Sequence, residues 1–209
     1  MVAPALAEDD LRMTIVARWR DMPMRVRLAA PLGDDELFEF CAANRDLRIE
    51  RTADGELLIM PPTGGETGRR NFDLIGQFAD WVRHDGTGIG FDSSTGFLLP
   101  NGAERAPDVA WVSKQRWNAL SDKQRRRFPP LCPDFVLELR SPSDSLADQC
   151  AKLEEYIACG ARLGWLVDPD NRRVHVYRPG RAVQIVEGVN ELRGDPELPG
   201  LALDLRLIW

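Results

Sequence analysis

The sequence predicts an α/β fold in which helices flank a mixed central β-sheet. Two segments have the 3.6-residue apolar period of amphipathic helices, and short β-branched and aromatic runs beside them have the character of strands. The order helix, strands, helix, strands excludes a repeat array and favours helices layered on a sheet. The chain has 209 residues, of which 44% are hydrophobic and 29% charged, which is enough for one sizeable core.

The first predicted elements follow an irregular start. Residues 1–30 show no clear period and carry charges of both signs, so we expect an N-terminal arm there and one domain over residues 31–209. In that domain, Asp34 or Asp35 can cap a helix that continues to Cys41. Asp54-Gly55 then predicts a hairpin turn between strands at residues 47–49 and 56–60.

The middle of the chain predicts the sheet and its first long helix. Apolar residues recur at helical spacing from Phe72 to Val82, and Gly86 ends the run. Strands are expected over the ranges 89–91, 97–99, 109–112 and 135–139. Segment 113–130 is rich in Lys and Arg; we interpret it as an excursion whose charges either contact a phosphate backbone or are simply solvated.

The last third of the chain predicts a second helix and a hairpin. Apolar residues from Leu146 to Ile157 fit a helix closed by Gly160. Strands at 164–167 and 174–177 are joined by a turn at Asp168-Pro169.

Composition narrows the function classes. A formal charge of −6 gives no global attraction to nucleic acid, so such a partner needs a local basic patch or a bridging metal. There is no apolar run of about 18 residues and no signal peptide, so we expect a cytoplasmic protein without a membrane span. Scattered cysteines argue against structural zinc, and neither histidine is placed as a catalytic base.

Two acids interrupt apolar strands, and they predict a shared cation or a catalytic task. Burying Asp108 and Glu138 costs several kcal/mol unless something compensates for their charge. Asp134 is a poorer second acid because it lies four residues before Glu138, about 13 Å away along the same strand. Arg140 shares a strand face with Glu138.

A hard divalent cation such as Mg²⁺ or Mn²⁺ suits these two acids. It would take the carboxylate oxygens of Asp108 and Glu138, a backbone carbonyl such as that of Leu139, and water. A cation of this kind activates water and offsets charge on a phosphate, so phosphodiester hydrolysis follows. Two alternatives need no metal: Asp108 accepts backbone hydrogen bonds at a strand end, and Glu138 pairs with Arg140.

The spacing of these residues resembles the PD-(D/E)xK nuclease superfamily. Pro107-Asp108 is followed by Glu138-Leu139-Arg140, with Arg where Lys is usual. Arg cannot give up its proton, so it could stabilise charge but not act as a base. Lys152, on the next helix, resembles a known variation of the superfamily; the alternative is a solvated lysine paired with Asp148 or Tyr156.

From about Asp34 to Trp209 the chain is similar to the Uma2 family, also called DUF820, described as restriction endonucleases. This resemblance implies a restriction-endonuclease-like core with Asp108 and Glu138 as metal ligands and Lys152 or Arg140 as the cationic partner. Glu66 resembles, more weakly, an extra helical acid of such sites. The motifs that carry the resemblance are Asp54-Gly55-Glu56, Met60-Pro61-Pro62, Ser94-Thr95-Gly96-Phe97, Pro107-Asp108-Val109-Ala110, the run from Val136 to Ser143, Lys152 with Tyr156, and Trp165-Leu166-Val167-Asp168-Pro169.

The expectation is therefore a metal-dependent endonuclease acting on DNA, most simply as a homodimer that cuts both strands. Lys152 would orient or activate water, Arg140 would contact the scissile phosphate, and Glu66 would complete an outer shell. One competing reading is an inactive nuclease-fold module that binds nucleic acid or a protein partner. Another is a structural fold in which Glu138 and Arg140 merely pair.

Overall fold

The computed structural model describes residues 23–209, and the chain divides into two compact units. Among the described residues, the smaller consists of 23–62 and Asn101–Arg105, and the larger of Thr63–Pro100 and Ala106–Trp209. Most of the predicted N-terminal arm, residues 1–22, lies outside the described residues. The boundary expected between the N-terminal arm and the domain, at residue 31, stays a prediction.

The smaller unit contains four paired strands and one helix. They are β1 (Met24–Val26), β2 (Arg48–Arg51), β3 (Leu57–Met60) and β6 (Glu104–Arg105), in the antiparallel order β1-β3-β2-β6, with α1 (Asp34–Ala43). The predicted hairpin is confirmed, and Gly55 takes a left-handed φ of 82° in its turn. The predicted cap is wrong by one residue: Gly33 is the N-cap, and Asp34 lies in the first turn of α1.

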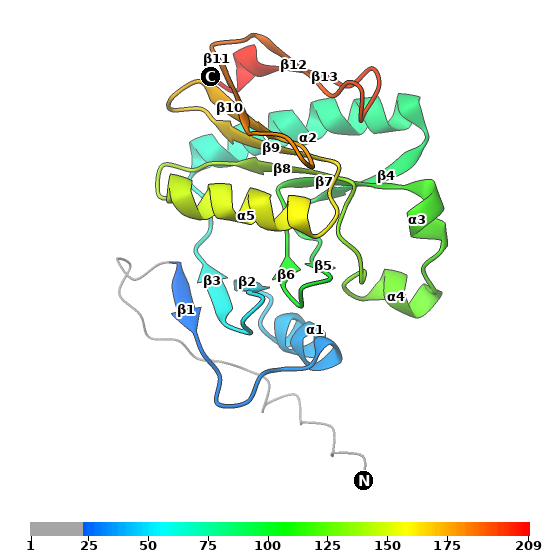
Figure 1. The fold of residues 1–209 in the computed structure, drawn as a ribbon. Coiled ribbons are helices and arrows are strands. Elements are labelled where there is room, and N and C mark those ends of the chain that lie inside the picture. Colours follow the sequence, from blue (N-terminus) through cyan, green and yellow to red (C-terminus); the bar gives the residue numbers. More distant parts are fainter. Residues whose placement is uncertain (1–22) are drawn as a thin grey trace. The chain divides into compact units, whose positions relative to one another are not determined.

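The larger unit contains the predicted mixed central sheet. Its order is β11-β10-β9-β8-β7-β4, and only the β8–β9 pair is parallel. Helices α2 and α5 flank it (Figure 1). The six strands are β4 (Gly88–Asp92), β7 (Val109–Ser113), β8 (Phe135–Leu139), β9 (Leu163–Asp168), β10 (Arg173–Tyr177) and β11 (Gln184–Glu187). The helices are α2 (Gly65–Asp85), α3 (Lys114–Asn118), α4 (Asp122–Arg126) and α5 (Leu146–Ala158), and the shorter pieces are β5 (Phe97–Leu98), β12 (Glu191–Arg193), β13 (Ala202–Asp204) and the 3₁₀ turn Leu205–Leu207.

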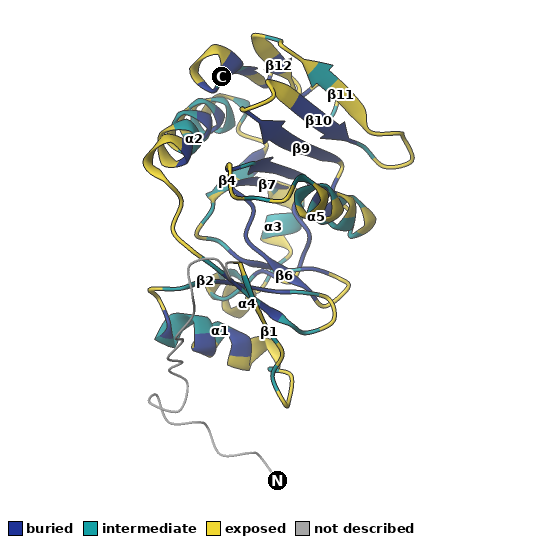
Figure 2. Cartoon of the chain, turned by 90° about the vertical axis from the view of Figure 1, so that its left-hand side faces the viewer, coloured by how far each residue is buried: buried dark blue, intermediate teal, exposed yellow. Residues whose placement is uncertain are grey.

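Alternation along β8 separates an apolar face from a polar one. Phe135, Leu137 and Leu139 belong to the core on the α2 side, where the rings of Phe135 and Phe78 stack with centroids 5.4 Å apart. Glu138 projects to the other face, which α5 covers. All five residues of β8 are buried, and Figure 2 shows the neighbouring strands β7 and β9 buried as well. A charged group on this strand therefore needs partners from α5 or from the adjacent strands.

The end of α2 and the start of α5 each have an identifiable capping interaction. Gly86 adopts the left-handed conformation (φ 64°) and donates its N–H to the Val82 carbonyl, which closes α2. The hydroxyl of Ser145 accepts the N–H of Asp148 at the start of α5. The structure begins α2 at Gly65, two turns before the predicted apolar run. No helix within residues 23–209 combines the length and apolarity needed to cross a bilayer.

His175 on β10 predicts a pH dependence of stability. Its side chain is 8% exposed, and its Nε2 has no hydrogen-bond partner among residues 23–209. Burial lowers its pKa below 6.5; Asp168 opposes this shift and Arg173 adds to it. Just below pH 6.5 the unfolded chain therefore binds more protons than the folded one. We expect the free energy of unfolding to fall as the pH drops from 6.5 through the folded pKa.

Denaturant unfolding across this pH range measures the effect. His175→Gln should remove this part of the pH dependence, whereas His84→Gln, on the exposed surface of α2, should leave it in place. Equal pH profiles for wild type and His175→Gln would contradict the assignment.

Candidate active site

The register of β7 and β8 brings the two predicted acids level with each other. Val109 pairs with Leu137 and Ala110 with Val136, so Asp108, one residue earlier, comes opposite Glu138. Directly opposed residues of antiparallel strands project to the same face with Cβ atoms about 5 Å apart. Asp108 is 9% exposed and Glu138 3%. The structure thus gathers both carboxylates on one buried face, beside α5.

The Asp108 side chain closes the end of the β7–β8 ladder by accepting a backbone hydrogen bond. Its Oδ2 accepts the Leu139 N–H at 2.8 Å. Continuing the register places Pro107 opposite Leu139, and proline has no N–H to donate. The Leu139 carbonyl therefore receives no ladder hydrogen bond from that position. This geometry favours its predicted use as an oxygen ligand.

Glu138 is held by two side chains of α5. Lys152 Nζ lies 2.9 Å from its Oε1, and the Tyr156 hydroxyl donates to the same oxygen at 3.1 Å. The Lys152 side chain is only 11% exposed, so its ion pair is buried, and the alternative of a solvated lysine does not describe it. The sequence analysis did not identify the Tyr156 hydroxyl as a partner of Glu138. The spacing of Lys152 and Tyr156 at i and i+4 was the available signal.

Arg140 binds a different acid from the one considered in the sequence. One guanidinium nitrogen lies 3.1 Å from Asp168 Oδ1 and 3.2 Å from Oδ2, and its Nε donates to the Asp144 carbonyl at 3.2 Å. The parallel register pairs Leu139 with Val167, so Arg140 comes level with Asp168. The ion pairs that form are Glu138–Lys152 and Arg140–Asp168. Arg140 thereby joins the ends of β8 and β9 to the loop before α5.

The other acids lie apart from this site. Glu66 is exposed at the start of α2, and its carboxylate pairs with Arg69 at 2.8 Å, which lowers its pKa. Asp134, at the opposite end of β8, binds Arg116 at 3.0 Å and accepts the Ser113 N–H at 2.9 Å. In the described part of the chain, no three His, Cys, Asp or Glu side chains cluster as a metal site would require. The structure thus does not bring Glu66 into a three-acid cluster with the two central carboxylates.

The oxygen donors at this site suit Mg²⁺ or Mn²⁺ better than a cation whose ligands must all come from the protein. Magnesium keeps several waters and is commonly bound by one or two carboxylates together with substrate phosphates. Asp108, Glu138 and the Leu139 carbonyl supply oxygens of this kind from two adjacent strands.

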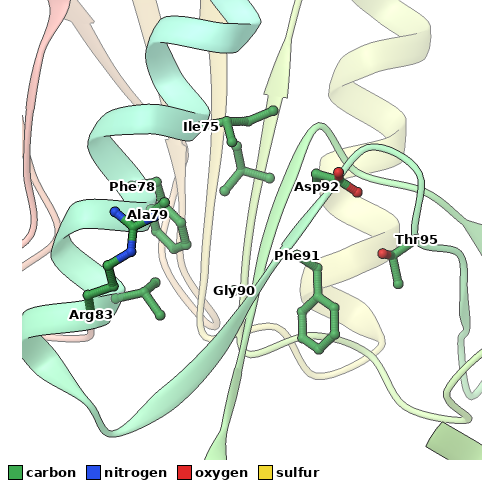
Figure 3. Close-up of a pocket in the computed structure, with 10 residues that line it drawn as sticks. Ile75, Phe78, Ala79, Arg83, Gly90, Phe91, Asp92 and Thr95 are labelled. Atoms are coloured by element: carbon green, nitrogen blue, oxygen red, sulfur yellow. The ribbon is translucent and has the colours of Figure 1, made fainter.

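A pocket of about 470 Å³ lies elsewhere, between α2 and β4 (Figure 3). Val109 lines it, but Asp108 projects to the opposite face of the sheet. This pocket is therefore separate from the carboxylates.

Comparison with known proteins supports the nuclease-like fold. A family model, Uma2, described as "Putative restriction endonuclease", matches residues 34–206. Among solved structures, "a putative nuclease belonging to DUF820" from Anabaena variabilis aligns with a TM-score of 0.65 at 18% identity, covering 77% of this chain and 88% of that one. No curated protein matches the chain. With its model matched over residues 34–206, the chain belongs to the Uma2 family.

Proposed function

We propose that this protein is a metal-dependent endonuclease that hydrolyses phosphodiester bonds in DNA. The observation that carries the proposal is the placement of Asp108 and Glu138 at opposed positions on one face of the sheet, beside Lys152. Both carboxylates and the Leu139 carbonyl would hold Mg²⁺ or Mn²⁺. When bound, the ion would lower the pKa of a water and stabilise charge on the phosphate.

Lys152 supplies the lysine that the motif position, occupied by Arg140, lacks. Its ammonium, held beside Glu138, can donate hydrogen bonds to an attacking water or to a phosphate oxygen. Tyr156 is a positioning residue because its hydroxyl orients the Glu138 carboxylate. We assign Arg140 a positioning role too, through Asp168. Its predicted contact with the scissile phosphate and the outer-shell role of Glu66 stay predictions, as do a homodimer and a cytoplasmic location.

One observation favours the competing reading of an inactive nuclease-fold module. The Lys152 ammonium already balances the charge of Glu138 without a metal. Such a site could persist as a structural ion pair after catalysis is lost.

A cleavage assay separates the two readings. We expect the purified protein to convert supercoiled plasmid to nicked and linear forms with Mg²⁺ or Mn²⁺, and not with EDTA. Glu138→Gln keeps an acceptor for the Tyr156 hydroxyl but removes the charge, and should lower the rate at least ~100-fold, since even outer-shell changes at metal sites cost 10- to 100-fold.

Asp134→Asn is the matched control, because it makes the same change from acid to amide at a buried residue just before β8, outside the site. It should stay within a few fold of wild type. Failure to cleave with either metal would favour the inactive module, and equal cleavage by wild type and Glu138→Gln would contradict the assigned site.

A further inference from the structure

The excursion between β7 and β8 concentrates positive charge that the candidate active site does not use. Segment 113–130 contains six Lys or Arg residues and a single acid, Asp122, whereas the whole chain has 27 cationic and 33 acidic residues. A local surplus of one sign on a protein of the opposite net charge attracts a counter-charged partner to that place. We call the exposed cations Lys114, Lys123 and Arg126 the basic patch.

Two other cations of the excursion hold it in shape. The Arg125 guanidinium donates to the carbonyls of Trp117 and Asn118 at 3.2 and 3.1 Å, and it lies over the Trp117 ring, 5.8 Å from the centroid. Arg116 lies 3.0 Å from Asp134 at the start of β8. These contacts join α4 to α3 and α3 to the central sheet. The basic patch is therefore carried on a fixed support, which lowers the cost of ordering it when a partner binds.

The cations of the basic patch have no comparable structural task. Lys123 and Arg126 lie three residues apart on one face of α4, where like charges repel each other. In the part of the chain that the structure describes, no carboxylate pairs with Lys114 or Arg126. A surface that serves solubility alone mixes both signs of charge, which this segment does not do. An anionic partner accounts for the arrangement better than solvation.

The excursion packs on the same face of the sheet as the two carboxylates. Asp108 and Ala110 share a face because side chains alternate along a strand, and Ala110 pairs with Phe91 of β4. The Phe91 ring in turn contacts Trp117 of α3, with centroids 5.2 Å apart. Figure 1 shows α4 and α5 on the side of the sheet away from α2. The basic patch and Glu138 therefore lie on the same side of the larger unit.

The distance between them suits one DNA duplex. Asp108 and Lys114 flank the two ends of β7, six residues apart, which is about 20 Å at 3.3 Å per residue. Phosphates of one DNA strand follow each other every 3.4 Å along the helix axis, so this distance corresponds to about six base pairs. A duplex that lies along β7 with one phosphate at the carboxylates would present further phosphates to the basic patch.

We propose that the basic patch binds the phosphate backbone of the DNA substrate, about six base pairs from the bond that is cleaved. The inference rests on the proposed function for the identity of the partner, but the contact requires neither the metal nor cleavage. Phosphate contacts from Lys and Arg position a duplex without reading its sequence. They also explain how a chain with a formal charge of −6 holds a polyanion.

Fluorescence anisotropy with a labelled duplex of about 30 base pairs, in EDTA to prevent cleavage, tests the proposal on the full chain. The triple variant Lys114→Gln, Lys123→Gln and Arg126→Gln should bind at least ~10-fold more weakly than wild type at about 0.1 M salt. The slope of log affinity against log salt should become shallower by about 3, since each phosphate contact contributes about 0.9. All three side chains are exposed, so the unfolding midpoint should match wild type.

The matched control neutralises three exposed arginines at the other edge of the sheet and beyond it, by Arg173→Gln, Arg181→Gln and Arg193→Gln. It changes the net charge equally and should keep the affinity and salt slope of wild type. Equal binding by the patch variant and wild type, an equal loss in the control, or no binding by wild type would each overturn the proposal.

The result is separable from that of the cleavage assay. A wild type that binds DNA through the basic patch but does not cleave plasmid would support the patch and favour the inactive module. A wild type that cleaves plasmid while the patch variant keeps full affinity would reject the patch alone.

Discussion

Replacing Lys152 with methionine should lower the free energy of unfolding by about 3 kcal/mol, because removing one partner of a buried ion pair leaves the other charge uncompensated. The carboxylate left behind is that of Glu138, which is 3% exposed and 2.9 Å from the ammonium. Methionine keeps most of the apolar stem of lysine, so lost packing contributes little. Denaturant unfolding measures the change as a lower midpoint at constant slope.

The double variant Glu138→Gln with Lys152→Met shows whether the loss is electrostatic. Both charges are then absent and Gln still accepts from Tyr156, so most of the lost stability should return. Arg173→Met is a matched control at an exposed pair with Glu187 and should cost less than about 1 kcal/mol. A double variant as unstable as Lys152→Met alone would show that the two charges are not coupled.

Replacing Asp108 with asparagine should remove metal binding while preserving the fold. The amide oxygen of Asn can still accept the Leu139 N–H, now bonded to Asp108 Oδ2 at 2.8 Å, so unfolding should stay within about 1 kcal/mol of wild type. Asp108→Leu leaves that N–H without its acceptor and should cost about 1–3 kcal/mol. Parallel denaturant unfolding of both variants would separate the two roles of this side chain, and equal stabilities would contradict the structural one.

The sequence predicted the larger unit well because its elements have strong periods. The helical spacing along α5 and the β-branched runs of β7 to β10 are local sequence patterns, and the folded chain forms the elements that they predict. Strands β11, β12 and β13 were missed, since they are short and mostly exposed and have no clear alternation of apolar and polar residues. Their pairing depends on neighbouring strands that local patterns do not identify.

The candidate site was predictable to a similar extent. Asp108 and Glu138 stand out because an acid in an apolar strand is costly, and the family resemblance drew attention to Lys152. The partner of Arg140 was not predictable, because Asp168 is brought to it by a parallel register between strands joined through a helix. The hydroxyl of Tyr156 was missed for a similar reason, as its acceptor lies on another element.

Isothermal titration calorimetry with Mn²⁺ tests the central claim most directly, because it requires no substrate. The account predicts saturable binding to wild type and to Asp134→Asn, and binding at least ~100-fold weaker for Asp108→Asn and Glu138→Gln, each of which removes a charged ligand. Equal binding of Mn²⁺ to wild type and Asp108→Asn would contradict the claim that these opposed carboxylates hold the ion.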